Sequence, residues 1–386
     1  MFAFTKLVFK NAFRHKLRST LTIAGIAIAI LAFGLLRTVI AAWYAGVDAS
    51  APNRLIVRNS VSFTFPLPLS YKNGIVAVPG VNQVTYALWF GGVYIDERNF
   101  FPQFAIDPTT WFDVYPEFRL PPEQKTAFIR ERNAAVVGVK VAERYGWKLG
   151  DTVRLRGTFF PGDWDFVIRG IYTGANRSTD QTAFMFHWDY LNEQIQKSEP
   201  GRAGHVGWYV ARVGDPEASG AISRAVDQRF QNSLAETKTE TEKAFQQGFV
   251  AMTGAILSAL KVISVVIIGV ILAVLSNTMA MTARERLSEY AVLKTLGFGA
   301  PHLIFLIAGE SLLIALLGGG LGIALMYPAA GAFGKAMENF LPIFELKSAT
   351  LFTAAVIAAA VGLVASLFPS WRAVNVKIVE GIRRIG

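Results

Sequence analysis

The stretch VISVVIIGVILAVLSNTMAM, residues 262–281, carries no charged side chain and decides the fold class. A helix needs about 20 predominantly apolar residues to cross the hydrocarbon core of a bilayer. Three other segments are long and apolar enough to do the same: 21–45, 301–327 and 351–368. The sequence therefore predicts an α-helical membrane protein with four transmembrane helices, the second of them lying within residues 249–281.

The composition disfavours a soluble enzyme. Of the 386 residues, 17% are charged and 52% are hydrophobic, yet the formal net charge is +10. Soluble domains average about 25% charged residues. The chain contains no cysteine, which excludes a disulfide framework, a thiolate metal site and a cysteine nucleophile.

The positive charge is concentrated in three segments. Residues 46–248 contain 22 basic and 22 acidic side chains, whereas the excess of Lys and Arg falls mainly in 1–20, 282–300 and 369–386. By the positive-inside rule these three segments are cytoplasmic, and 46–248 and the short loop 328–350 lie outside. No basic stripe remains on the outer domain, so no nucleic-acid partner is predicted. The first apolar run exceeds a signal-peptide core in length, which favours an uncleaved anchor over a cleaved signal peptide.

The outer region, 46–248, is predicted to be a mixed α/β domain. Strands are indicated by short alternating or β-branched runs at 54–58, 83–86, 93–95, 134–137, 152–155 and 166–171. Residues 72–78 and 139–145 are predicted to be short helices. Residues 159–165 and the 178–190 region are predicted to be loops with exposed aromatic side chains.

The end of the outer region is polar and rich in helix-forming residues, and no proline separates it from the second span. This predicts one continuous helix from about 235 to 281. A rigid stalk that transmits motion is the favoured interpretation. A simple linker followed by a span is the alternative.

We find no catalytic set. The chain has no H-E-x-x-H, G-x-S-x-G or G-x-x-x-x-G-K-[ST] string. A metal site is one interpretation of five polar residues, but surface charge and packing account for them better: His187, His205, Asp163, Asp165 and Asp189. No catalytic, cofactor-binding or metal-ligating residue is predicted, and the chain is not expected to be an enzyme.

Three features in or beside the spans need an explanation. Glu310 interrupts the third span, and a carboxylate there is expected to be protonated or paired with a helix terminus or with Ser311. Arg37 and Lys261 are expected to reach the headgroups. The third span also holds a glycine cluster, which is typical of tight helix packing or of dimerisation: Gly318, Gly319, Gly320 and Gly322.

The loop 282–300 carries the most specific pattern. Residues 282–296 are predicted to form a short amphipathic helix that ends at Gly297. Its apolar face is Leu287, Tyr290, Ala291 and Leu293 to Leu296, and its polar face is Arg284, Glu285, Arg286 and Glu289. Such a helix either lies on lipid or docks into a groove on a cytosolic partner.

The order of these parts resembles the MacB/FtsX-type ABC transporter permease family. The resemblance covers nearly the whole chain. It rests on the amphipathic start at 11–19 and on motifs at 137–145, 149–151, 166–171, 277–279, 283–286, 289–297, 309–311, 318–322, 369–373 and 378–383. Tyr290-Ala291 and Thr295 depart mildly from the family pattern. The outer domain would then be a MacB-like periplasmic domain.

The resemblance implies partners and a mechanism. It implies a homodimer of four-span subunits in a bacterial inner membrane, bound to two copies of a separately encoded ABC ATPase that holds ATP and Mg. A periplasmic adaptor, an outer-membrane channel and membrane lipid are further implied partners. ATP-driven closure would move the stalk and the outer domain, which is called mechanotransmission. The residues expected to couple to the ATPase are Arg284, Glu285, Arg286, Glu289, Tyr290, Leu293, Lys294, Leu296 and Gly297.

The sequence allows two other functions and disfavours a third. An FtsX-like signalling permease would activate a cell-wall hydrolase from its outer domain. A lipoprotein-release permease would work as a heterodimer with a related permease. A membrane hydrolase is disfavoured, because the sequence offers no nucleophile set.

Overall fold

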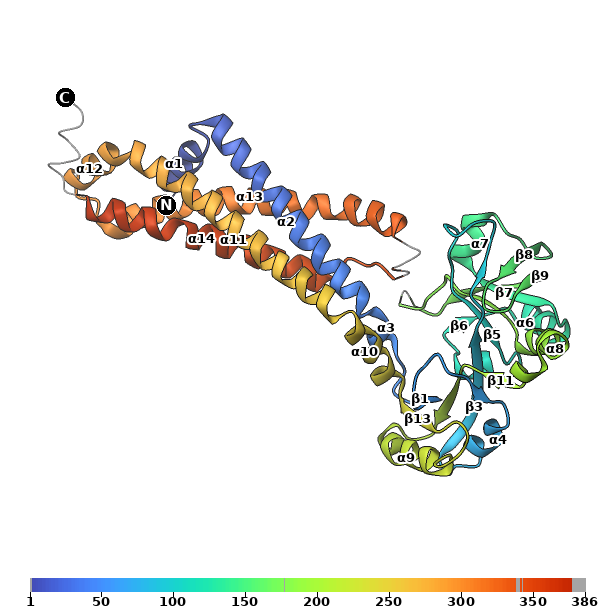
Figure 1. The fold of residues 1–386 in the computed structure, drawn as a ribbon. Helices are drawn as coiled ribbons and strands as arrows, with labels where there is room; N and C mark the ends of the chain where they lie inside the picture. The colour runs from blue at the N-terminus through green and yellow to red at the C-terminus, as the bar shows by residue number, and fades with distance from the viewer. Residues whose placement is uncertain (1, 177, 338–340, 342, 377–386) are drawn as a thin grey trace. The chain divides into compact units, whose positions relative to one another are not determined.

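The computed structural model describes residues 2–176, 178–337, 341 and 343–376 (Figure 1). The chain divides into two compact units. We call them the helical unit (residues 1–42, 253–336 and 344–386) and the α/β unit (43–252 and 337–343). The division matches the alternation of apolar and mixed-polarity sequence.

The helical unit contains the four long apolar helices. Its described helices are α1 (Phe2–Ala12), α2 (Lys16–Trp43), α11 (Gly254–Glu285), α12 (Leu287–Thr295), α13 (Ala300–Ala336) and α14 (Ser348–Asn375). Of the described helices, α2, α11, α13 and α14 are long and apolar enough to cross a membrane. The prediction of four spans is confirmed. The helices α13 and α14 extend several residues beyond the apolar runs that predicted them.

Small residues let three of these helices pack closely. A Cβ atom at Gly319 would lie 2.5 Å from the Cβ of Ala358 in α14. At Gly322 it would lie 2.6 Å from the carbonyl oxygen of Ala27 in α2. These distances are shorter than atoms tolerate, so α13 approaches its neighbours at positions that only glycine allows.

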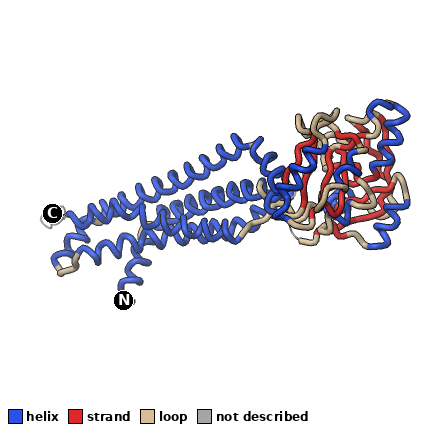
Figure 2. The backbone as a smooth tube through the Cα atoms, turned by 90° about the horizontal axis from the view of Figure 1, so that it is seen from below, coloured by secondary structure: helices blue, strands red, loops and turns tan. Residues whose placement is uncertain are grey.

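The α/β unit is built on a mixed sheet, and Figure 2 shows strands in this unit and not among the long helices. In the described part of the chain, eleven strands join in the order β13-β1-β12-β3-β5-β10-β7-β9-β8-β4, with β6 beside β9, and β2 pairs separately with β11. The strands are β1 (Arg54–Asn59), β2 (Leu67–Pro68), β3 (Val81–Trp89), β4 (Gly92–Val93), β5 (Gln103–Ile106), β6 (Phe118–Arg119), β7 (Ala134–Gly138), β8 (Thr152–Gly157), β9 (Gly162–Gly174), β10 (Phe184–His187), β11 (His205–Val206), β12 (Trp208–Val213) and β13 (Thr237–Thr241).

Helices cover both faces of this sheet. Side chains alternate between the faces along a strand, so Leu55 and Val57 of β1 enter one core and Ile56 enters the other. The first core is covered by α4 (Tyr71–Val76), α7 (Val139–Tyr145), α8 (Trp188–Ser198) and α9 (Ser219–Arg229). The second is covered by α5 (Trp111–Val114), α6 (Pro122–Arg130) and α10 (Glu242–Met252). The short helix α3 (Ala45–Ala49) precedes β1, and two 3-10 turns lie at Pro200–Arg202 and Pro216–Ala218.

The continuous helix predicted from 235 to 281 is wrong. Residues Thr237–Thr241 form β13, which pairs with β1 at the sheet edge. The hydroxyls of Thr237 and Thr239 donate to the carboxylate of Asp227 at 2.9 and 2.7 Å, which holds the strand against α9. Helix α10 begins only after the strand, and Thr253 separates it from α11.

Two predicted loops are wrong in part. Residues 159–161 and 178–183 lie outside helices and strands, as predicted, but 162–165 belong to β9 and 184–190 lie in β10 and α8. Phe159 is 60% exposed, as predicted, whereas Phe184 and Phe186 are 0% exposed and Trp164 is 6% exposed. The predicted strand at 93–95 ends at Val93, since Ile95 adopts a φ of 60° and turns the chain.

Candidate functional site

The segment between the second and third spans forms two helices instead of one. Helix α11 runs through to Glu285, breaks at Arg286, and α12 follows. Gly297 ends α12 with a φ of +91°. Its N–H donates to the carbonyl of Lys294 at 3.1 Å, and the N–H of Phe298 donates to the carbonyl of Leu293 at 3.0 Å. This pair of bonds is the Schellman motif, and it turns the chain into α13.

A buried ion pair joins this break to the third span. Arg286 Nη1 lies 3.0 Å from Glu310 Oε2, and the two residues are 7% and 3% exposed. Arg286 Nε also lies 2.9 Å from Glu289 Oε2, and its guanidinium is 5.5 Å from the ring centroid of Tyr290. The intramembrane carboxylate therefore has a cationic partner, and the expected pairing with a helix terminus or Ser311 is wrong. The hydroxyl of Ser311 instead donates to the carbonyl of Gly362.

The N-terminal helices supply two further ion pairs. Arg14 Nη1 pairs with Glu289 Oε1. Arg18 donates to both carboxylate oxygens of Glu285 at 2.9 Å. Burial would raise the pKa of Glu289, but the hydrogen bonds from Arg14 and Arg286 outweigh it and lower the pKa. Glu289 is thus held as an anion between two guanidinium groups.

The end of α12 is fixed to the fourth span. Lys294 Nζ donates to the carbonyl oxygens of Val374 and Val376 at 2.5 and 2.8 Å. These carbonyls lie at the C-terminus of α14, where a helix leaves acceptors unpaired and carries partial negative charge. The break at Arg286 and the short helix α12 are therefore bonded to the turn between α1 and α2, to α13 and to α14.

The predicted coupling residues divide into two groups. Arg286 and Tyr290 are buried, and Glu289, Leu293 and Lys294 are partly buried. The predicted polar face is therefore wrong at Arg286, which points inward. The exposed members are Arg284, Glu285, Leu296 and Gly297.

Three residues of this site were not predicted from the sequence. Val292 is 43% exposed beside Leu296 at 69%, although the apolar pattern gave no reason to place it outside. For Arg14 and Arg18, the sequence predicts a place in the cytoplasmic charge excess and in the amphipathic start at 11–19, but no ion pair. Their opposite charge to Glu285 and Glu289 was the available signal.

The other candidate residues lie apart from this segment. Gly318, Gly319 and Gly322 pack against α2 or α14 within the chain, while a Cβ at Gly320 would meet no atom within 4 Å. His187 is buried with its Nε2 2.6 Å from the carbonyl oxygen of Phe128. Among the residues with described positions, no three His, Asp or Glu side chains gather closely enough to hold a metal ion.

Two family models match the chain. The MacB-like periplasmic core domain matches residues 19–229, which is more than half of the chain, and the FtsX-like permease C-terminal domain matches residues 261–378. The chain belongs to the MacB/FtsX-type ABC transporter permease family. The permease is a multi-pass membrane protein, with a mixed α/β domain of the MacB-like type between its first and second spans.

Curated relatives agree with this assignment. The permease is 24% identical to an uncharacterized ABC transporter permease of Methanocaldococcus jannaschii, over 97% of its own length and 96% of the relative's. It is 23% identical to an uncharacterized ABC transporter permease protein of Mycobacterium tuberculosis, spanning 67% of this chain and 29% of that one. A macrolide export ATP-binding/permease protein MacB of Yersinia pestis is 28% identical over 33% of the permease and 18% of its own length.

Among solved structures, the permease is similar to the extracellular domain of the noncanonic ABC-type transporter YknZ from Gram-positive bacteria. The identity is 14% and the TM-score is 0.35, over 49% of the permease and 99% of that chain.

Proposed function

We propose that this chain is the transmembrane subunit of a MacB-like ABC exporter, and that a separate ATPase subunit drives it through α12. Two permease copies and two ATPase copies would make the working complex, which lies in a bacterial inner membrane and moves its α/β unit by mechanotransmission. A periplasmic adaptor and an outer-membrane channel would extend the export path.

The observation that carries the proposal is the way α12 is held. Ion pairs and hydrogen bonds fix α12 and the break before it to the turn between α1 and α2, to α13 and to α14, while Val292 and Leu296 remain exposed. A displacement applied to the exposed side would pass to α13 through Arg286 and to the end of α14 through Lys294. Two exposed apolar side chains on a rigid helix are a typical anchor for a groove on a partner protein.

We expect Val292→Asp combined with Leu296→Asp to weaken ATPase binding about tenfold or more, since burying two carboxylates at an apolar contact is costly. The measurement is co-purification with the proposed ATPase subunit, together with ATP hydrolysis by the complex. Thermal unfolding of the permease alone is expected to stay within about 0.5 kcal/mol of the unchanged protein, because both side chains are exposed.

The matched control is Leu234→Asp, an exposed leucine in the α/β unit. It introduces the same change away from α12 and is expected to leave ATPase binding unchanged. Retention of normal binding and hydrolysis in the double variant would show that α12 is not the coupling element.

The chain has no cysteine, so the proposed orientation is open to single-cysteine labelling. Thr64→Cys lies in an exposed loop of the α/β unit, and Thr295→Cys lies on the exposed side of α12. With a membrane-impermeant maleimide, we expect Thr64→Cys to be labelled in spheroplasts and Thr295→Cys only in inverted vesicles. Labelling of Thr295→Cys in intact spheroplasts would contradict the orientation. The cysteine-free parent is the control for background labelling.

A further inference from the structure

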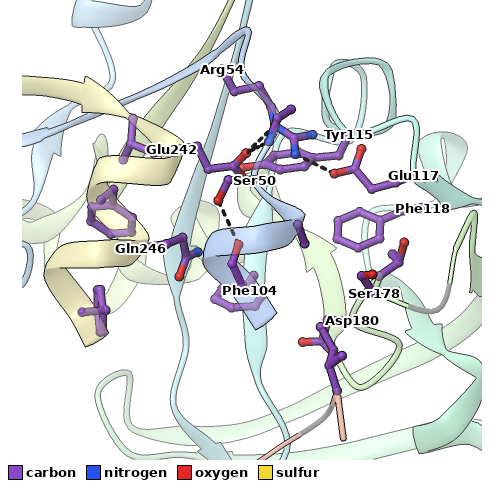
Figure 3. Close-up of a pocket in the computed structure, with 18 of the residues that line it drawn as sticks. Ser50, Arg54, Phe104, Tyr115, Glu117, Phe118, Ser178, Asp180, Glu242 and Gln246 are labelled. Carbon is purple, nitrogen blue, oxygen red and sulfur yellow. Dashed lines mark hydrogen bonds and ion pairs between the residues drawn. The ribbon is translucent and has the colours of Figure 1, made fainter. Parts of the chain in front are cut away.

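A cavity of about 760 Å³ lies on the second-core face of the sheet in the α/β unit, bordered by β1, β3, β5, β12, α3, α5 and α10 (Figure 3). Cavities of roughly 300–1,000 Å³ are the size that encloses a small organic ligand. Nothing in the proposed coupling through α12 uses this cavity. We call it the aromatic cavity.

Aromatic side chains form its walls. Along one side, Phe63 lies 5.1 Å from Trp208, Trp208 lies 5.9 Å from Phe104, and Phe104 lies 5.3 Å from Trp89, all between ring centroids. On another side, Tyr115 stacks on Phe118 at 5.7 Å. An aromatic ring carries partial negative charge on its two faces and partial positive charge on its edge.

Arg54, which contributes a guanidinium group to the cavity lining, already forms ion pairs within the protein. Arg54 is paired with Glu117 at 2.7 Å and Glu242 at 2.8 Å, and it lies 4.2 Å over the ring of Tyr115. Glu242 is further fixed by the N–H of Ala51 at 3.0 Å. Figure 3 shows Arg54, Glu117 and Glu242 together. An anionic ligand would have to break these ion pairs. The side chain of Arg54 is only 4% exposed, so breaking them would leave buried charges unpaired.

The balance of charged groups in the cavity lining favours a cationic ligand. Among the described lining residues, the carboxyl groups of Glu117, Glu242 and Asp180 outnumber the single guanidinium. Asp180 accepts hydrogen bonds from the N–H and hydroxyl of Thr182. Burial raises its pKa, against the lowering effect of those hydrogen bonds and of the positive charge of Lys140. A nearby cation would favour the ionised form and would itself be stabilised.

We propose that the aromatic cavity binds an apolar organic cation, such as a lipophilic amine or a quaternary onium compound. Aromatic faces attract cations at short range, most strongly where water is excluded, and the carboxylates supply the complementary charge. The apolar walls enclose the substituents. The site lies within one chain, so its ligand binding can be tested without the ATPase.

The test uses two ions of the same shape and opposite charge. Tetraphenylphosphonium and tetraphenylborate fill the same volume, so only the sign of the charge separates them. With the purified full chain in detergent, equilibrium dialysis with detergent on both sides subtracts partitioning into micelles. We expect saturable binding of one tetraphenylphosphonium per chain, at least about tenfold tighter than tetraphenylborate. Equal binding of the two ions, or no saturation, overturns the proposal.

Two variants locate the site. Trp208→Ala is expected to weaken tetraphenylphosphonium binding about tenfold, and Glu117→Gln about fivefold, through loss of one ring face and one charge. Their matched controls are Phe65→Ala and Glu199→Gln, both exposed and outside the cavity lining. If Trp208→Ala lowers the unfolding temperature, Phe104→Leu replaces it as a milder loss of aromatic surface. Equal affinity in cavity variants and controls places the ligand elsewhere and refutes the assignment.

Discussion

The variant Arg286→Ala is expected to lose about 3–5 kcal/mol of stability, because it leaves the buried carboxylate of Glu310 without its cation. The same change frees α12 from Glu310 and removes one of the two guanidinium groups at Glu289. We therefore expect a lower unfolding temperature of the full chain in detergent. We also expect loss of stimulated ATP hydrolysis in the complex.

Two comparisons separate the buried pair from a general charge effect. Arg284→Ala removes an exposed arginine two residues away, and its effect is expected to stay within about 0.5 kcal/mol. The double variant Arg286→Met with Glu310→Gln removes both charges and is expected to recover much of the lost stability, since no unpaired charge remains. Similar unfolding temperatures for Arg286→Ala and Arg284→Ala would mean that the ion pair contributes little.

A second large effect is expected from Gly322→Ala. Its added methyl group would lie 2.6 Å from the carbonyl oxygen of Ala27, which is backbone and has little freedom to move. Forcing α2 away from α13 is expected to cost about 1–3 kcal/mol. The measurement is thermal unfolding of the full chain in detergent.

The matched control lies two residues earlier on the same helix. A Cβ at Gly320 would meet nothing within 4 Å, so Gly320→Ala is expected to be neutral or to stabilise by up to about 1 kcal/mol through higher helix propensity. A loss in Gly320→Ala equal to that in Gly322→Ala would argue against the described contact between α2 and α13.

The features that could be predicted from sequence are those with a local cause. The presence of four transmembrane helices follows from the length of the four apolar runs alone. The strand at 134–138 follows from its compact β-branched run, and the helix at 139–145 ends at Gly146, whose φ of 68° suits glycine. Each of these depends on residues within one turn or one strand.

The features that were missed depend on distant neighbours. Phe184 and Phe186 lie in a short strand that pairs with β5 on one side and β7 on the other. An apolar run of that length does not by itself distinguish a strand from a buried helix segment. Arg286 and Glu310 are 24 residues apart. Their pairing requires the turn at Gly297 to fold α13 back beside the break, and that geometry is not visible in either residue type.

The edge pair β1 and β13 has a consequence for how the α/β unit bears load. The chain enters β1 after α3 and leaves β13 into α10, so both connections join the sheet at the same end of one antiparallel pair, next to the Leu55–Thr241 rung. A force drawing these two connections apart would open the ladder one rung at a time instead of shearing all rungs together. The ion pair of Arg54 with Glu242 lies one position beyond this first rung, at the open end of the ladder. It is the contact at which tearing of the sheet would begin.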